Sequence, residues 1–261
     1  MRKLFIIYGL FLFIGCCFFA GNFLVEAKNE APAEKVVPHV ALPVVTEARI
    51  VSDSASPFIS ETERSLINAG LVNIKSMDSS IYVDLKYSTN DNFLFSDVYG
   101  DLNNGYLQKD VADKLRIAQK LLKSRFSYYS LVVYDAVRPR SIQAKMWDSI
   151  DVPARERSKY VSNPHNGSLH NYGAAVDLSI IDEQGIALDM GTPYDYFGEL
   201  AYPREEQRMI REGKLTYKQL YNRQILREIM QQAGFSGITT EWWHFNSCSR
   251  NEAASRYKIV E

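Results

Sequence analysis

The sequence predicts an α+β fold, a single domain with a mostly antiparallel central sheet flanked by helices. Two kinds of hydrophobic spacing lead to this prediction. Apolar and polar residues alternate in the segments 81–87 and 175–181, as they do in strands. Apolar residues recur at steps of three and four in the segments 107–122 and 217–233, as they do on one face of a helix. These segments lack the regular strand–helix alternation of a parallel sheet, so antiparallel pairing is favoured.

The elements are expected in the following order along the chain. A strand over 81–87 precedes a helix over 107–122, whose opposite face carries Lys, Arg and Asp. The apolar run 130–137 predicts a strand that Pro139 interrupts, and Ser141 is then expected to cap a short helix. The remaining elements are a strand over 175–181, helices over 204–213 and 217–233, and a closing strand over 238–246.

Composition and charge narrow the range of functions. The chain is 46% hydrophobic and 23% charged, which is typical of a folded globular protein and not of a disordered one. Its 30 Lys and Arg residues against 31 Asp and Glu residues leave a formal charge of -1. Non-specific nucleic-acid binding requires a basic field that this balance does not provide. We therefore expect no nucleic acid among its partners.

Residues 1–27 are predicted to be a signal peptide or a membrane anchor. A basic start precedes an apolar run, 4–25, and small residues around Ala27 suit cleavage. The run is also long enough to cross a bilayer uncleaved, since about 20 apolar residues suffice. The segment 13–16 (FIGC) resembles a lipid-attachment site. All three alternatives predict an exported protein, located in the periplasm or cell envelope and in two of them attached to the membrane.

Residues 28–60 are predicted to be a flexible tether, and residues 61–261 to be the functional domain. The tether holds four of the nine prolines of the chain, a composition typical of linkers. The remainder is long enough to bury a sizeable core. Cys248 is the one cysteine within it, so we expect no disulfide in the domain and a packing role for this side chain.

Two histidines of the domain stand in segments that suggest metal chemistry. His170 lies in SLHNYGAAVD, which ends at Asp177, and His244 lies in EWWHF, which begins at Glu241. His170, Asp177 and His244 form a reasonable donor set for a catalytic zinc, which takes three protein ligands and keeps a fourth position for water. Zinc lowers the pKa of that water towards about 7, and Glu241 is placed to accept its proton. His165 is assigned to a loop, because a fourth protein ligand would exclude the water.

The proposed site requires the backbone to depart from a regular strand. On a regular strand, residues 241 and 244 point to opposite faces. Glu241 and His244 therefore reach one metal only if the chain bulges or turns between them. The segment from His170 to Asp177 raises the same difficulty, and Gly173 provides the freedom to bend there.

The pairing of SxHxxGxAxD with a later ExxH resembles the zinc D,D-peptidase superfamily, which includes D-alanyl-D-alanine dipeptidases and D,D-carboxypeptidases. The dipeptidase branch fits best. The segments that carry the resemblance occur in order between about residues 72 and 247, so they span nearly the whole domain. They are DLKYST at 84–89 followed by DNF at 91–93, YDAVRP at 134–139, DMGTPYD at 189–195, and EWWHF at 241–245.

The resemblance implies the chemical roles of five residues. His170, Asp177 and His244 would bind one zinc ion per chain, and Glu241 would be the general base. Arg138 would stabilise the oxyanion of the tetrahedral intermediate. A permanently charged guanidinium suits that role, because it favours developing negative charge over the ground state.

The resemblance also implies three substrate contacts. Ser168 would contact the carboxylate of the substrate, whereas Asp195 and Tyr87 would hold its free ammonium. A buried carboxylate opposite a charged amino terminus forms a strong charge-assisted hydrogen bond.

The function implied is the zinc-dependent hydrolysis of the small dipeptide D-Ala-D-Ala to two D-alanines, in which Asp195 selects a free amino terminus. One alternative is a D,D- or L,D-carboxypeptidase or endopeptidase that trims peptidoglycan peptides, as export would permit. Another is a non-catalytic module that binds cell-wall peptides, although such a module has no need of Glu241.

Overall fold

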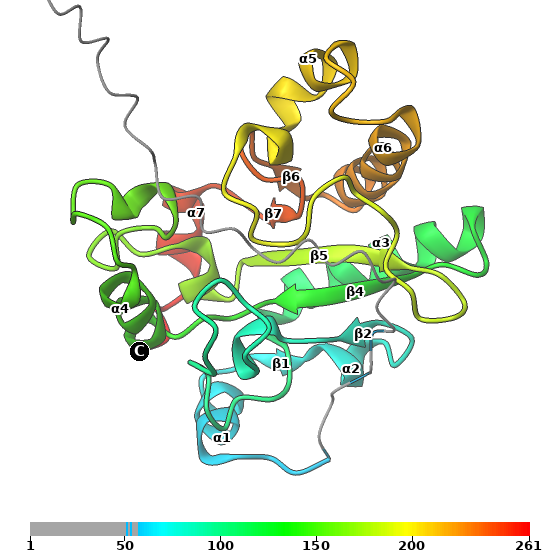
Figure 1. Cartoon of the computed structure of the whole chain (residues 1–261). Coiled ribbons are helices and arrows are strands. Elements are labelled where there is room, and N and C mark those ends of the chain that lie inside the picture. Colours follow the sequence, from blue (N-terminus) through cyan, green and yellow to red (C-terminus); the bar gives the residue numbers. More distant parts are fainter. Residues whose placement is uncertain (1–50, 52, 54–56) are drawn as a thin grey trace, which may run out of the picture. The chain divides into compact units, whose positions relative to one another are not determined.

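A mixed five-stranded sheet lies at the centre of the described part of the chain, residues 51, 53 and 57–261 of this computed structural model (Figure 1). Its first pairing is parallel and the other three are antiparallel. The predicted α+β fold with a mostly antiparallel sheet is thus confirmed, with one parallel pair at its edge. The strands in spatial order are β2 (Tyr82–Val83), β4 (Ser130–Asp135), β5 (Ala175–Ile181), β7 (His244–Asn246) and β6 (Ser236–Gly237).

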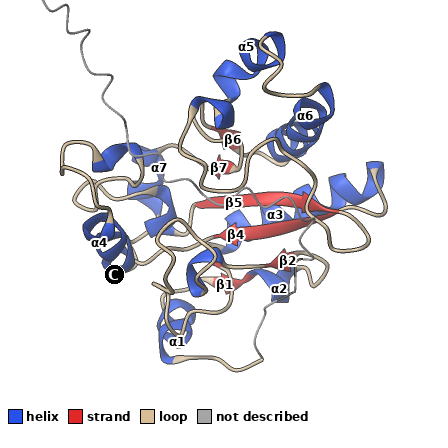
Figure 2. Cartoon of the chain, viewed as in Figure 1, coloured by secondary structure: helices blue, strands red, loops and turns tan. Residues whose placement is uncertain are grey.

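Helices flank this sheet (Figure 2). A separate antiparallel pair joins β1 (Val72–Asn73) to β3 (Tyr106–Leu107). The longest helix, α3, packs against both β4 and α6. This packing buries its apolar stripe. The helices are α1 (Glu61–Asn68), α2 (Ile74–Met77), α3 (Lys109–Arg125), α4 (Arg140–Ser149), α5 (Glu206–Arg211), α6 (Tyr217–Gln232) and α7 (Arg250–Arg256).

Several expected elements differ in their bounds from those observed, and three of the differences matter here. The strand expected over 81–87 is confined to β2, because a 3-10 helix at Lys86–Ser88 follows it. The strand expected over 238–246 begins only at His244, after a series of bends. Ser141 does not cap α4: the helix begins at Arg140 directly after Pro139, whose fixed φ of -53° already suits a helix start.

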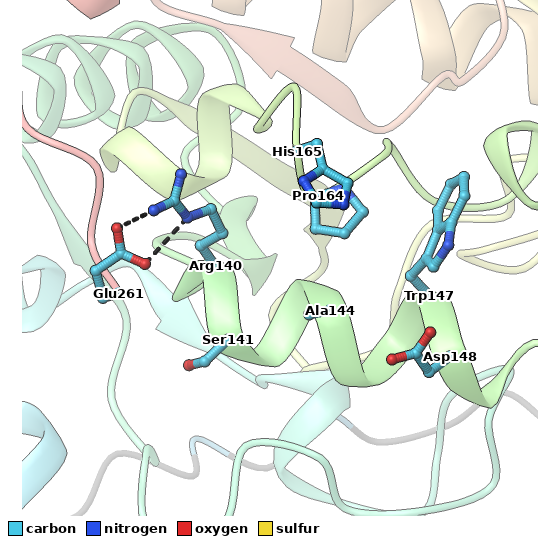
Figure 3. A pocket seen from close by; sticks show the side chains of 8 residues that line it. All are labelled: Arg140, Ser141, Ala144, Trp147, Asp148, Pro164, His165 and Glu261. Atoms are coloured by element: carbon cyan, nitrogen blue, oxygen red, sulfur yellow. Dashed lines mark hydrogen bonds and ion pairs between the residues drawn. The ribbon is translucent and has the colours of Figure 1, made fainter.

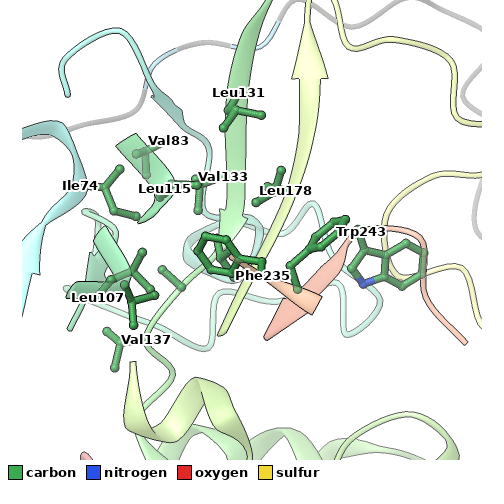
Figure 4. Packing of buried hydrophobic residues seen from close by; sticks show 14 of the residues in the cluster. Ile74, Val83, Leu107, Leu115, Leu131, Val133, Val137, Leu178, Phe235 and Trp243 are labelled. Carbon is green, nitrogen blue, oxygen red and sulfur yellow. The ribbon is translucent and has the colours of Figure 1, made fainter. Parts of the chain in front are cut away.

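Both faces of the central strands are buried. Every residue of β4 and β5 is inaccessible or nearly so. Side chains of α3 and of the segments near β6 and β7 cover them, among them Leu115, Phe235 and Trp243 (Figure 4). The polar positions of the alternation at 175–181 therefore point into the protein, and Asp177 is only 3% exposed. A carboxylate buried to that extent requires charged or hydrogen-bonding partners.

The segments predicted to precede the domain lie largely outside the described residues. This applies to the whole of the predicted signal peptide or anchor, 1–27, and to most of the predicted tether, 28–60. At Val51, however, the latter segment contacts the domain: the side chain is buried, and its amide donates a hydrogen bond of 2.8 Å to the carbonyl of Gly185. Within the part of the chain that the structure describes, we find no helix with the length and apolar character needed to cross a membrane.

Substitution of Gly173 tests how tightly the turn that follows His170 is packed. This residue ends the 3-10 helix Leu169–Tyr172 at φ 63°, and an added Cβ would lie 2.9 Å from Cδ2 of Leu71. Gly213 has a similar φ of 67° but no neighbour within 4 Å. We expect Gly213→Ala to lower the free energy of unfolding by about 1 kcal/mol through backbone strain alone. Gly173→Ala should cost about 2 kcal/mol more, because it adds a steric clash. Urea unfolding measures both, and equal losses would contradict the packing argument.

Candidate active site

His170, Asp177 and His244 converge from three separate elements. His170 lies in the 3-10 helix Leu169–Tyr172, Asp177 in β5 and His244 in β7, where antiparallel pairing places it directly opposite Asp177. One ligand atom from each residue lies within 4.8 Å of the others. His244 Nδ1 is 2.9 Å from Asp177 Oδ1 and 3.2 Å from His170 Nε2. The three predicted metal ligands are therefore brought together.

Surrounding groups orient each of these donor atoms. His170 Nδ1 donates to the carbonyl oxygen of Ala136 at 2.7 Å, which leaves the lone pair on Nε2. His244 Nε2 donates to Asn246 Oδ1 at 2.8 Å, so the lone pair of the neutral ring is on Nδ1. Such partners commonly fix the tautomer of metal-binding histidines. Two imidazole nitrogens and a carboxylate oxygen that face one another fit a catalytic zinc ion.

The second oxygen of Asp177 also has a partner. Oδ2 accepts a hydrogen bond of 3.0 Å from the hydroxyl of Tyr194. Burial raises the pKa of Tyr194 well above its usual value, so this hydroxyl retains its proton and acts as the donor. Oδ1 is thereby left to face the two histidines.

The charges of Asp177 and the two histidines stabilise one another. Burial alone would raise the pKa of Asp177, but the two histidines outweigh burial and hold that pKa well below its usual range. Burial opposes the charge on His244, but the hydrogen bond to Asp177 and its negative charge raise the pKa of His244 to about 9. In the metal-free protein His244 is therefore protonated at neutral pH.

Glu241 lies in the bends that precede β7. Its Oε2 is 3.9 Å from His244 Nδ1, so the turn expected between these two residues is confirmed. The side chain remains 35% exposed, and desolvation of its carboxylate raises the pKa of Glu241. Trp242 and Trp243 between them are buried, and Trp242 Nε1 donates to Thr192 Oγ1 at 2.8 Å. The tryptophans thus fix the backbone between Glu241 and His244.

Arg138 follows β4 and is held by a carboxylate that sequence reasoning missed. Its Nε donates to Asp135 Oδ2 at 3.0 Å, and its Nη2 is ion-paired with the same carboxylate. Nη2 also lies 3.9 Å from Oδ2 of Asp177, and the guanidinium lies 5.2 Å from the centre of the Tyr87 ring. Tyr99 donates to Asp135 as well. The one signal for Asp135 was its position at the end of a strand, three residues before Arg138.

Asp195 and Tyr87 also meet, although 108 positions separate them in the sequence. The Tyr87 hydroxyl donates to Asp195 Oδ2 at 2.7 Å. Asp195 is 7% exposed, and this burial raises its pKa well above the usual value. Its φ of 58° places a non-glycine residue in the left-handed region, a strained conformation that surrounding structure must hold in place.

Arg223 of α6 helps to hold this conformation. Its Nε donates to the carbonyl of Met190 at 2.6 Å, and its Nη2 donates to that of Leu200 at 2.9 Å. These carbonyls lie on either side of Asp195, so one buried side chain ties both ends of the segment 190–200 to α6. Sequence reasoning missed Arg223, since nothing in the helical spacing distinguishes it from a surface arginine.

The predicted site residues line a single pocket of about 230 Å³. Ser168 is one of the lining residues, and its Oγ accepts a hydrogen bond of 3.2 Å from the amide of His170 and so caps the 3-10 helix. All eight predicted residues contribute to the lining: Tyr87, Arg138, Ser168, His170, Asp177, Asp195, Glu241 and His244.

A larger pocket of about 540 Å³ lies beside α4 and contains none of these eight residues (Figure 3). An ion pair between Arg140 and Glu261 occupies one end of it, and Trp147 lies towards the other. His165 is exposed there and does not belong to the donor set, as expected. The smaller pocket is therefore the one that contains the metal-donor set and the other predicted site residues.

Comparisons with known proteins show the family of this chain. Residues 67–260 match a family model described as D-ala-D-ala dipeptidase. A D-alanyl-D-alanine dipeptidase of Escherichia coli (strain K12) is 33% identical over 181 residues, which cover 67% of this chain and 83% of that protein. The chain belongs to this peptidase family. The resemblance seen in the sequence motifs is thus confirmed.

Other relatives are more distant. A D-alanyl-D-alanine dipeptidase of Enterococcus faecium is 27% identical over 180 residues, 62% of this chain and 83% of that protein. The solved structure of the LdcB LD-carboxypeptidase covers 57% of this chain and 63% of its own, with 19% identity and a TM-score of 0.36. A likeness that weak supports no conclusion about this chain.

The pKa of about 9 at His244 gives a prediction for metal binding. A zinc ion held by this donor set would have to displace the proton from His244, so its affinity should rise with pH up to about 9, by about tenfold per pH unit. Calorimetric titration with zinc in two buffers of different ionisation enthalpy measures the proton released. At about pH 6 a zinc-bound water, whose pKa is near 7, keeps its proton, so a release there reports on the ligands. Zinc binding without proton release at that pH would contradict the assignment of His244 as a ligand.

Proposed function

We propose that the chain is a zinc-dependent dipeptidase that hydrolyses D-alanyl-D-alanine to two molecules of D-alanine. One observation carries the proposal: a single pocket of about 230 Å³ holds the His170, Asp177 and His244 donor set together with Glu241 and Asp195. A donor set and a base suit peptide hydrolysis, whereas the buried Asp195 suits a substrate with a free ammonium.

The ligands of the zinc ion would be His170 Nε2, Asp177 Oδ1 and His244 Nδ1, the atoms that face one another in the donor set. When bound, zinc would polarise the scissile carbonyl and lower the pKa of a water molecule. The hydrogen bonds from His170 to Ala136 and from His244 to Asn246 keep both lone pairs directed at the site.

Glu241 would act as the general base. Its carboxylate is close to the donor set and partly open to the pocket, so it can accept a proton from water and return it to the leaving amine. Desolvation raises the pKa of Glu241, which brings this group closer to the pKa that two-way proton transfer at neutral pH favours.

Arg138 would stabilise the oxyanion. Asp135 holds the guanidinium in place, so little reorganisation is needed when negative charge develops. Tyr87 lies against its face, which also favours a fixed orientation.

Asp195 and Tyr87 would bind the ammonium of the substrate. A charged ammonium offsets the cost of burying the Asp195 carboxylate. An acylated amino terminus offers no such charge, so it leaves the carboxylate without a cation and is rejected.

We also propose that the protein is exported to the cell envelope. The support is the pattern of residues 1–27, with a basic start and a long apolar run. Peptides released from the cell wall would then be accessible to the enzyme.

Substrate selection can be tested with the full-length protein. The zinc-loaded chain should hydrolyse D-Ala-D-Ala and not N-acetyl-D-Ala-D-Ala, and EDTA treatment should abolish the activity. Asp195→Asn should lower kcat/KM for the free dipeptide by about a hundredfold, the effect expected when one partner of a buried charge pair is lost. Equal cleavage of the two substrates by the parent would instead support a carboxypeptidase. Cleavage of neither substrate, with zinc bound, would support a non-catalytic binding module.

The role of Glu241 can be tested separately from metal binding. Glu241→Gln should lower kcat by about a thousandfold, since it removes the general base, while zinc content measured by atomic absorption stays at one ion per chain. Glu228→Gln, which alters an exposed glutamate of α6, is the control and should leave kcat unchanged. Substantial turnover by Glu241→Gln would remove this residue from the mechanism.

A further inference from the structure

The pocket is lined by a second arginine that no motif includes. Arg250, the first residue of α7, lines it together with Ser168. Its Nη1 donates to the carbonyl oxygens of Asn166 at 2.6 Å and Gly167 at 2.9 Å. These two carbonyls immediately precede Ser168, so the guanidinium is attached to the same turn that presents the Ser168 hydroxyl.

The two arginines of the pocket differ in how their charge is balanced. Asp135 binds Arg138 through both Nε and Nη2, so that charge is largely offset within the protein. Among the described residues, the partners of Arg250 are backbone carbonyls, and no carboxylate of those residues lies within 4.0 Å of its guanidinium. Its positive charge is therefore available to a ligand.

The proposed substrate supplies a matching charge. A free dipeptide is a zwitterion, and its ammonium is assigned to Asp195. The donor set receives the scissile carbonyl, so the carboxylate lies on the other side of that bond. Ser168 is expected at this end, and its Oγ accepts from His170 while its own proton stays free to donate. A carboxylate is bound best by such a donor together with a fixed guanidinium.

We propose that Arg250 supplies the charge that binds the C-terminal carboxylate of the substrate beside Ser168, and that it thereby determines specificity for a free carboxyl terminus. This inference rests on the proposed function for the location of the scissile bond. It implies that the enzyme discriminates against a substrate whose carboxylate is replaced by a neutral amide.

The test compares D-Ala-D-Ala with D-alanyl-D-alaninamide, using the full-length zinc-loaded protein. Arg250→Gln should lower kcat/KM for the dipeptide by about tenfold or more, since a charge-assisted contact is lost, and leave kcat/KM for the amide unchanged. Arg250→Lys should restore part of the preference, because it keeps the charge. Arg256→Gln is the matched control: it removes a charge from the same helix, but its side chain is paired with Asp110. This control should retain the full preference for the dipeptide.

Two results would overturn the inference. An equal loss with both substrates would mean that Arg250 only supports the turn at 166–167, and an unchanged preference in Arg250→Gln would place the carboxylate elsewhere. Calorimetric binding of both compounds to Glu241→Gln, with and without Arg250→Gln, tests the subsite without turnover. If the parent cleaves neither compound, the proposed function fails, whereas the dipeptide-against-amide difference in binding still decides the role of Arg250.

Discussion

The burial of the Asp177 carboxylate is the constraint on which the site depends. β5 is covered on both faces, so this charge receives almost no solvation by water. Its partners are His170, His244 and Tyr194, which come from a 3-10 helix, from β7 and from the segment 190–200. A buried charge that loses a partner is strongly destabilising. The sheet must therefore form completely before the carboxylate is satisfied, and the fold and the donor set are stabilised together.

The charged groups around the donor set also depend on buried partners. Asp135 lies opposite Asp177 across the β4–β5 pairing, and the guanidinium of Arg138 lies close to both carboxylates. Two like charges on adjacent strands would repel each other, and Arg138 offsets them. Arg223 acts on the backbone instead, since it binds carbonyls at both ends of the segment that contains the strained Asp195. Arg138 thus balances buried charge, whereas Arg223 fixes a backbone conformation that local sequence would not maintain.

Residue spacing predicted the helices and strands whose formation depends on neighbouring residues. The apolar stripe of α3 was sufficient to predict its buried face, and the alternation of β5 was sufficient to predict a strand, although not the burial of its polar positions. The turn between Glu241 and His244 was also predictable, since a regular strand cannot direct both side chains to one metal. Asp135, Arg223 and Arg250 were not predictable, because their importance comes from the tertiary structure. Arg250, for instance, contacts carbonyls more than 80 positions away. The error at Ser141 arose because Pro139 already sets the backbone for the helix start.

The proposed charges at the two ends of the pocket explain how a dipeptide could be selected by length. Asp195 belongs to a segment that Arg223 fastens to α6, whereas Ser168 and Arg250 belong to a turn joined to α7. Both are tied to the same sheet, so the distance between a bound ammonium and a bound carboxylate is set by the fold. A longer peptide satisfies one terminus and leaves the charge at the other unpaired. Discrimination then comes from the desolvation cost of the unsatisfied group. Such a pocket needs no steric wall to exclude longer substrates.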